Sequence, residues 1–290
     1  MRYQISHTTT YRYSQPVTLY PHVVRLRPRS DSSQTLQSFS LLVTPEPMNQ
    51  SQVLDLDGNS TIKVWFKPEP AESLVVQVLS QVETHQTDPF NYLLEPWALS
   101  LPIDYPASLF GQLQPYLVAQ FPGYGSAIDP VAVQLAQEIS QQAEGNSALF
   151  LTLLNQQIYQ NCKQLIRETG DPFPPGVTWT AQAGSCRDLT VLFVEVCRAI
   201  GLAARFVTGY NEGDPDSRKF HLHAWAEVYL PGAGWRGFDP TQGLAVADRH
   251  VALVASAFYR YAGPISGSFN RAGGAQSEMS YQLVIQGINQ

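Results

Sequence analysis

The segment from Ser185 to Thr241 constrains the fold more than any other part of this 290-residue sequence. Apolar residues recur at helical spacing between Leu189 and Ile200, which predicts an amphipathic helix with one buried face. Strict alternation in residues 222–230 then predicts a strand, and a turn rich in Gly leads to a second strand at 235–241. A helix followed by a β-hairpin predicts an α+β core in which the helix packs on an antiparallel sheet.

Cys186 lies in the first turn of this predicted helix. Ser185 is suited to the N-cap position, and Asp188 follows it at the spacing of a capping box. Unpaired backbone N–H groups and the positive end of the helix dipole favour a thiolate there, so we expect Cys186 to be a nucleophile. The other two cysteines, Cys162 and Cys197, are expected to be inert thiols, and three cysteines without paired spacing do not predict a disulfide framework.

His223 and Asp239 are the predicted base and the carboxylate that orients it. The hairpin returns Asp239 toward the His223 end of strand 222–230. Because side chains alternate with a period of two, the two residues share a face only if facing residue numbers sum to an even value. We therefore expect an odd-numbered loop or a bulge near residues 232–234.

A thiol, an imidazole and a carboxylate together predict covalent acyl transfer. The thiolate attacks a carbonyl carbon, the imidazole moves the proton, and the carboxylate fixes the imidazole tautomer. The backbone N–H of Cys186 is one expected oxyanion donor, and the side chain of Gln182 or Trp179 is the expected second donor. Trp225 and Trp179 are candidate walls of a cleft for an extended peptide.

A metal site is the alternative explanation for His221 and His223. No third histidine or carboxylate at suitable spacing completes such a ligand set. A dense carboxylate loop of the calcium-binding kind is also missing from the sequence. We therefore expect no metal and no other cofactor, and we expect His221 to be solvated or to support His223.

The sequence divides into three regions. Residues 1–88 hold short runs of β-branched and aromatic residues with a tight turn at Asp57-Gly58, which predicts a β-sandwich-like domain. Residues 89–128, rich in Pro and Gly, are predicted to connect it to a catalytic core at 129–290.

Two helices and a closing strand are predicted within this core. Helical periodicity predicts helices at 130–142 and 147–168, and the apolar stripe from Phe150 to Ile166 is expected in the core. A Pro-rich loop at 170–176 separates them from the Cys186 helix, and a last strand is expected at 280–286.

Composition and charge narrow the classes of function. The formal net charge is -6 and no basic run is present, so a nucleic-acid partner is not expected. A content of 44% hydrophobic residues is sufficient to bury two cores. The first residues lack a signal-like apolar stretch and no spanning run occurs, which predicts a cytoplasmic protein without membrane contact. The sequence makes no prediction of oligomeric state.

Four blocks of sequence, taken in order, resemble the core of bacterial transglutaminase-like proteins within the papain-like cysteine hydrolase and transferase group. These blocks are Gly184–Asp188, Cys197–Tyr210, His223–Tyr229 and Gly234–Thr241. The run Tyr3–Tyr13 resembles the domain that precedes this core in bacterial members. The resemblance implies the family order Cys, His, Asp for Cys186, His223 and Asp239. Residues 247–250 also resemble a family element, which we expect to support the loop beneath Asp239 rather than to bind substrate.

Two functions of different classes fit the sequence. The first is a cysteine-dependent enzyme that forms a thioester with a peptide or protein substrate. Water would resolve the thioester in a protease or amidase and an amine in a cross-linking enzyme, and we expect hydrolysis. The second is a non-catalytic module that retains the fold and binds a peptide or partner. The intact Cys, His and Asp favour the enzyme.

Overall fold

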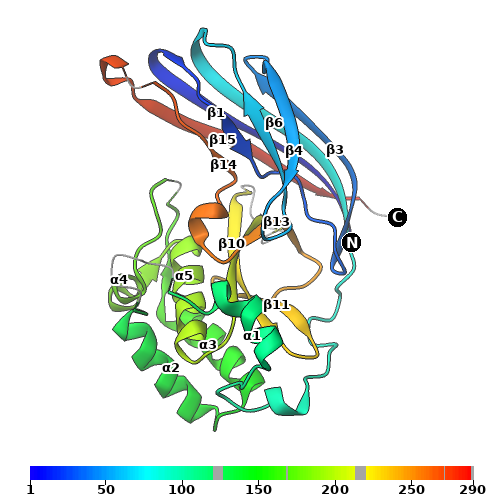
Figure 1. The fold of residues 1–290 in the computed structure, drawn as a ribbon, viewed down its shortest axis with the longest axis vertical. Helices are drawn as coiled ribbons and strands as arrows, with labels where there is room; N and C mark the ends of the chain where they lie inside the picture. Colours follow the sequence, from blue (N-terminus) through cyan, green and yellow to red (C-terminus); the bar gives the residue numbers. More distant parts are fainter. Residues whose placement is uncertain (120–126, 168, 213–219, 271, 289–290) are drawn as a thin grey trace.

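The chain folds into a strand-rich upper part and a lower part in which helices cover one side of a sheet (Figure 1). The computed structural model describes residues 1–119, 127–167, 169–212, 220–270 and 272–288. The predicted fold class is confirmed: an α+β protein with a β-sandwich-like N-terminal region and a core in which a Cys-bearing helix packs on an antiparallel sheet.

Two four-stranded antiparallel sheets form the upper part, in the orders β15-β1-β6-β3 and β14-β2-β5-β4. The strands are β1 (Arg2–Thr18), β2 (His22–Val24), β3 (Gln34–Thr44), β4 (Asn49–Leu54), β5 (Ser60–Trp65), β6 (Pro70–Thr84), β14 (Ile265–Ser266) and β15 (Ser277–Gly287). The predicted turn at Asp57-Gly58 joins β4 to β5, with Gly58 at a φ of 75°. The sequence did not predict β4, because all its residues are exposed and its side chains show no alternation of apolar and polar character.

The C-terminal end of the chain completes these upper sheets. β15 pairs with β1 from Tyr3 opposite Gly287 to Tyr13 opposite Ser277, and Figure 1 shows the red strand beside the blue one. β14 pairs with β2 in the other sheet. This pairing differs from the predicted division, which placed residues 129–290 in the core. Periodicity identifies a strand but not the distant strand that it joins.

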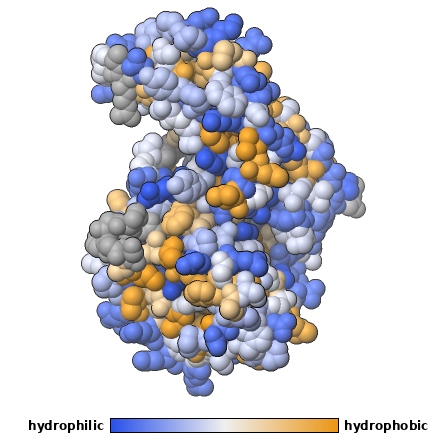
Figure 2. Space-filling view, viewed as in Figure 1, coloured by the Kyte–Doolittle hydropathy of each residue, from blue (hydrophilic) through white to orange (hydrophobic). Residues whose placement is uncertain are grey.

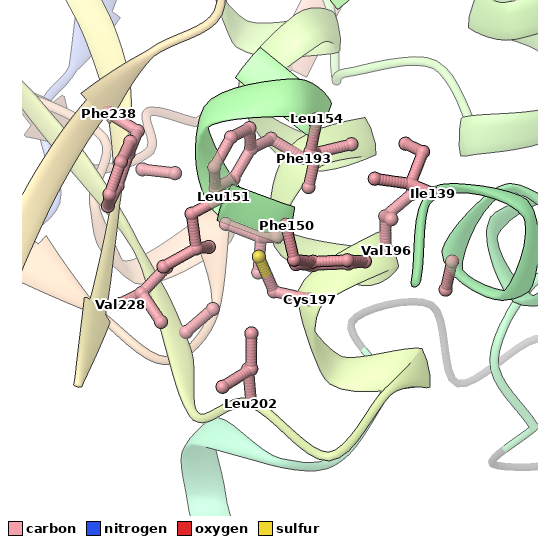
Figure 3. Packing of buried hydrophobic residues seen from close by; sticks show 14 of the residues in the cluster. Ile139, Phe150, Leu151, Leu154, Phe193, Val196, Cys197, Leu202, Val228 and Phe238 are labelled. Atoms are coloured by element: carbon pink, nitrogen blue, oxygen red, sulfur yellow. The ribbon is translucent and has the colours of Figure 1, made fainter. Parts of the chain in front are cut away.

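A five-stranded antiparallel sheet of order β12-β11-β10-β9-β13 forms the centre of the lower part. Its strands are β9 (Ala204–Asn211), β10 (Leu222–Leu230), β11 (Gly234–Asp239), β12 (Leu244–Ala245) and β13 (His250–Ser256). The helices are α2 (Pro130–Gln142), α3 (Ser147–Asn161), α4 (Pro175–Ala181) and α5 (Cys186–Ala199). Figure 3 shows side chains of α2, α3 and α5 meeting Val228 of β10 and Phe238 of β11, with the Cys197 sulfur among them.

The predicted connecting segment, residues 89–128, belongs to this hydrophobic core. It contains η1 (Pro96–Ala98), α1 (Ala107–Leu113) and η2 (Gln114–Tyr116). Ala98, Ile103 and Leu113 are buried in the same core as α5. The part of the segment at 120–126 lies outside the described residues.

α3 is shorter than the helix predicted at 147–168. It ends at Asn161 because Cys162 is extended and the next two residues, β7 (Lys163–Gln164), pair in parallel with β8 (Ala183–Gly184). The prediction that Leu165 and Ile166 lie in the core was wrong, since they are 42% and 74% exposed. Position 168, the predicted helix end, lies outside the described residues.

Side-chain amides of the upper part close the outer edge of the lower sheet. Gln34 donates to the carbonyl of Ala252 at 3.0 Å and accepts from its N–H at 2.7 Å. Asn59 makes the same pair of bonds with Ala255, at 2.8 and 2.9 Å. Each amide satisfies one N–H and one C=O of edge strand β13, as a neighbouring strand would. The two parts of the molecule are therefore joined by ordered hydrogen bonds.

The outer surface is mixed in polarity. Figure 2 shows hydrophobic residues in several areas of one face, and the outline is indented on the left where the upper and lower parts meet. Within the described residues, no helix has the length and apolar character needed to cross a membrane.

Candidate active site

Cys186 is the first residue of α5, as predicted from its capping residues. The Asp188 carboxylate accepts from the backbone N–H and the hydroxyl of Ser185, each at 2.7 Å. Its other oxygen accepts from the Arg167 guanidinium at 2.5 Å and from the Phe173 N–H at 2.7 Å. This fully buried carboxylate therefore ties the start of α5 to the preceding loop, while Cys186 stays half-buried.

The segment just before Cys186 is held by close backbone packing. The N–H of Leu165 donates to the carbonyl of Gly184 at 2.8 Å, which extends the pairing of β7 with β8. A Cβ on Gly184 would lie 2.8 Å from the Cβ of Asp188, so only glycine fits against the first turn of α5.

The β10–β11 hairpin confirms the predicted register. Ala226 faces Phe238 and Leu230 faces Gly234, so facing residue numbers sum to an even value. The loop at 231–233 has three residues, and Gly232 and Gly234 have φ values of 89° and 73°. His223 and Asp239 consequently point to the same face of the sheet.

The His223 ring lies between Asp239 and Cys186. Its Nε2 is 2.7 Å from Oδ2 of Asp239, and the Cys186 sulfur is near enough to the same ring to contribute to its raised pKa. Because Nε2 of His223 bonds to the Asp239 carboxylate, Nδ1 is the ring nitrogen that can interact with the Cys186 sulfur. Asp239 is fully buried and the His223 side chain is 11% exposed. The structure thus brings together all three residues that the sequence predicted as catalytic.

Burial and charge pairing act in opposite directions on these groups. Burial lowers the pKa of His223, but the Asp239 carboxylate and the Cys186 sulfur outweigh it and raise the pKa to about 10. Burial raises the pKa of Asp239, whereas His223 and His250 hold it well below its usual range. At neutral pH the pair is therefore an imidazolium and a carboxylate.

A second histidine, His250, also contacts Asp239. Its Nε2 is 3.1 Å from Oδ2, while Oδ1 accepts from the N–H groups of Thr241 at 2.9 Å and Gln242 at 3.3 Å. Each carboxylate oxygen therefore meets two donors. The sequence predicted that residues 247–250 support the loop beneath Asp239. It missed the direct contact, because spacing along the chain does not relate position 250 to a carboxylate across that loop.

His221 lies apart from this cluster. Its Nδ1 contacts the hydroxyl of Tyr281 on β15, and that contact links the start of β10 to the upper part. Among the described residues, the histidine and carboxylate atoms that lie within 4.8 Å of one another belong to His223, Asp239 and His250. These groups already hydrogen-bond to one another, so their proximity needs no ion. The predicted absence of a metal or other cofactor stays a prediction.

The residues predicted as oxyanion donors or cleft walls lie in three different environments. Trp225 is 1% exposed and meets the His250 ring edge-on at 5.2 Å, which does not fit the predicted role as a cleft wall. Trp179 is half-buried against the hydrophobic core that contains α5. Gln182 is exposed at the left-handed end of α4, with a φ of 49°. The oxyanion role of Gln182 or Trp179 stays a prediction.

The other cysteines differ from Cys186 in their surroundings. Cys162 is 6% exposed, and burial raises its pKa to about 11. Cys197 is fully buried, and burial raises its pKa well above the usual range. All three cysteines are free thiols, as expected without a disulfide framework. The environment of Cys162 and Cys197 favours the unreactive thiol.

Two family models match the chain. Residues 3–83 match the bacterial transglutaminase-like N-terminal region. Residues 133–240 match the transglutaminase-like superfamily, and this match includes Cys186, His223 and Asp239.

Curated relatives and a solved structure are also similar to this chain. An uncharacterised protein of Mycobacterium tuberculosis is 28% identical over 281 residues, which cover 92% of this chain and 87% of that protein. A protein-glutamine gamma-glutamyltransferase of Pseudomonas aeruginosa is 29% identical over 135 residues, 43% of this chain and 20% of that protein. A structure from Cytophaga hutchinsonii, provisionally described as a cysteine protease, has a TM-score of 0.72 at 20% identity and covers 100% of this chain and 92% of its own. This last likeness shows a shared fold.

Proposed function

Because this chain belongs to the transglutaminase-like superfamily and carries a bacterial transglutaminase-like N-terminal region, we propose that it is a cysteine-dependent acyl-transfer enzyme acting on peptide or protein amides. In this proposal Cys186 is the nucleophile, His223 is the general acid and base, and Asp239 orients His223. The observation that carries it is the position of the His223 ring, which bonds to the Asp239 carboxylate at 2.7 Å and lies near enough to the Cys186 sulfur for that sulfur to raise the pKa of the ring.

The first half of the proposed reaction forms a thioester. The Cys186 thiolate attacks the amide carbonyl carbon, and the electron pair of the carbonyl moves to its oxygen. Cys186 occupies the first position of α5, where the backbone N–H lacks an intrahelical acceptor and is available to the oxyanion. The His223 imidazolium then gives its proton to the leaving amine, and the C–N bond breaks.

The second half returns the free enzyme. Neutral His223 takes a proton from water, and the resulting hydroxide attacks the thioester carbonyl. The C–S bond breaks to release a carboxylic acid and the Cys186 thiolate. An amine in place of water would give a new amide bond, which is the cross-linking outcome.

Gln182 is the second oxyanion donor that we propose. Its backbone N–H already donates to Trp179 and its carbonyl accepts from Lys163, so the exposed side-chain amide is the group available to a substrate. The pairing of β7 with β8 holds this residue four positions before Cys186.

We place hydrolysis ahead of cross-linking. The structure that matches over the full chain is provisionally described as a cysteine protease, whereas the relative named as a protein-glutamine gamma-glutamyltransferase matches 43% of this chain. The alternative of a non-catalytic binding module has less support, because such a module does not require a half-buried thiol near a histidine that a buried carboxylate holds.

Alkylation with iodoacetamide tests the reactive thiol. We expect modification at Cys186 in the wild-type protein at neutral pH, read by peptide mass spectrometry, and none in Cys186→Ala. The matched control is Cys162→Ala, which removes a buried thiol and leaves the labelling unchanged. Equal total labelling of wild type and Cys186→Ala would rule out Cys186 as the nucleophile.

Substrate profiling separates the possible reactions. A proteome treated with wild type or with Cys186→Ala is scored for new N-termini and for incorporation of a fluorescent primary amine. New N-termini that depend on Cys186 support hydrolysis, and Cys186-dependent amine incorporation supports cross-linking. If both readouts match the Cys186→Ala control while Cys186 is unreactive to iodoacetamide, the binding module is the better account.

A further inference from the structure

Asp239 is held by more donors than pairing with one histidine requires, and the additional side-chain donor is His250. We propose that His250 is a positioning residue, whose Nε2–H holds the Asp239 carboxylate and, through it, the ring of His223. This inference rests on the proposed function, in which His223 is the acid and base.

The two imidazoles share one carboxylate oxygen. Oδ2 of Asp239 lies 2.7 Å from Nε2 of His223 and 3.1 Å from Nε2 of His250. The N–H groups of Thr241 and Gln242 hold the other oxygen. Rotation of the carboxylate would therefore break bonds at both oxygens. Asp239 is 0% exposed, so water would not replace the bonds that are lost.

The surroundings of His250 indicate which nitrogen carries its proton. Among the residues that the structure describes, its buried Nδ1 has no hydrogen-bond partner. An N–H at that position would be an unsatisfied buried donor, so a neutral ring with its proton on Nε2 fits better. The Asn211 atom that lies 2.8 Å from the same Nε2 is the amide nitrogen Nδ2, and turning the amide over exchanges it for the oxygen, which then accepts from the Nε2 proton.

Packing fixes the ring of His250. The residue is 7% exposed on β13 and meets the Trp225 indole edge-on, and the same indole lies 6.3 Å from the His223 ring. The titratable groups that face Asp239 are His223 on β10 and His250 on β13, and Cys186 of α5 lies on the other side of His223. Side chains of β10 and β13 therefore converge on one carboxylate, and α5 lies next to His223.

A positioning role for His250 concerns the orientation of the His223 ring, whereas a purely structural role concerns the stability of the fold. The direction of the Asp239 oxygen sets the rotation of the His223 ring, and the ring rotation sets whether Nδ1 meets the Cys186 sulfur. A small displacement at this point changes the reactivity of the thiol. A role limited to stability would lower the free energy of unfolding and leave the reactivity of the folded protein unchanged.

Two substitutions of matched polarity test this role through the rate of Cys186 alkylation by iodoacetamide. His250→Gln can place an amide N–H where Nε2 lies, whereas the shorter side chain of His250→Asn leaves that donor out of reach of Asp239. At about pH 6 we expect His250→Asn to lower the rate about tenfold and His250→Gln to stay within about twofold of wild type. His22→Asn is the control, since His22 is equally buried but lies on β2 in the upper part.

A second measurement needs no variant. ¹⁵N NMR of the histidine rings in the wild-type protein reports the tautomers, and we expect His250 to be neutral with its proton on Nε2. A proton on Nδ1 instead, or a folded His250→Asn that is alkylated as fast as wild type, would overturn the role of His250. An unreactive Cys186 in the wild type would count against the proposed function alone, because the tautomer still decides whether His250 donates to Asp239.

Discussion

At the level of single residues, the proposed chemistry of this protein depends on a buried charge pair beside a half-buried thiol. His223 stays protonated at neutral pH because Asp239 accepts from it at 2.7 Å inside the protein. Asp239 in turn stays ionised because four hydrogen bonds converge on its two oxygens. The charge pair therefore contributes to stability as well as to the proposed reaction.

The substitution Asp239→Asn should give a loss of stability that depends on pH. The pKa of His223 is raised from 6.5 to about 10, so its stabilisation is complete below pH 6.5 and is lost as the pH rises toward 10. The lowered pKa of Asp239 gives stabilisation above the ordinary carboxyl pKa of about 4, and this is lost in acid. We expect the difference in unfolding free energy from wild type to be largest between about pH 4 and pH 6.5, on the order of 3 kcal/mol.

Guanidinium denaturation of both proteins at about pH 5 and about pH 9.5 measures this difference. Asp104→Asn, at an exposed carboxylate, is the control and should show no such dependence. A loss of equal size at both pH values would contradict the charge pairing.

At the level of helices and strands, the site depends on how strand edges and helix starts are satisfied. α5 begins at Cys186 because the Asp188 carboxylate caps the helix by accepting hydrogen bonds from the N–H and the hydroxyl of Ser185. β13, which carries His250, is an edge strand whose outer N–H and C=O groups bond to the amides of Gln34 and Asn59. The upper part of the molecule thus holds the strand that supplies His250.

Gln34→Leu should destabilise the protein by leaving the N–H of Ala252 unpaired, whereas the carbonyl of Ala252 keeps its bond from the Arg29 N–H at 2.9 Å. An unsatisfied buried backbone group costs about 1–3 kcal/mol, and we expect a loss of unfolding free energy in this range. Urea denaturation followed by circular dichroism measures it. Gln37→Leu, on the same strand but exposed, is the matched control and should change stability by less than about 0.5 kcal/mol. Equal effects of the two substitutions would show that the edge contact contributes nothing.

At the level of the whole molecule, one of the hydrophobic clusters spans the two parts. Ile5 and Val76 of the upper sheets are buried in the same cluster as Phe206 and Leu253 of the lower sheet. A buried hydrogen bond of 3.0 Å between Nδ1 of His7 and the hydroxyl of Tyr210 crosses the same junction. Separation of the parts would expose apolar surface on both sides.

This shared cluster should make the chain unfold in a single cooperative transition. Val76→Ala, in the upper part, and Ile139→Ala, in the lower part, each remove fully packed side-chain atoms. We expect both substitutions to lower the midpoint of the same transition in differential scanning calorimetry, with calorimetric and van't Hoff enthalpies in agreement. Two transitions, each shifted by one of the variants alone, would show that the parts fold independently.

Local patterns predicted the features that depend on neighbouring residues. The capping residues before Leu189 predicted the start of α5, and the parity argument predicted an odd-numbered loop or a bulge between β10 and β11, where the structure has a loop of three residues. These features follow from helix capping and strand alternation, which act over a few residues and are therefore legible in the amino-acid order. Cys186, His223 and Asp239 were found in this way.

The remaining features arise from meetings between distant residues. β15 pairs with β1, and α3 ends before the two residues of β7, which pair with β8. Trp225 is buried, and His250 on β13 hydrogen-bonds to Asp239. Each depends on which distant strand or carboxylate a segment meets, and periodicity along the chain does not contain that information. The residues proposed as catalytic were thus predictable from the sequence, whereas the support around Asp239 was decided by packing, because a buried carboxylate takes its hydrogen-bond partners from residues that the fold brings together.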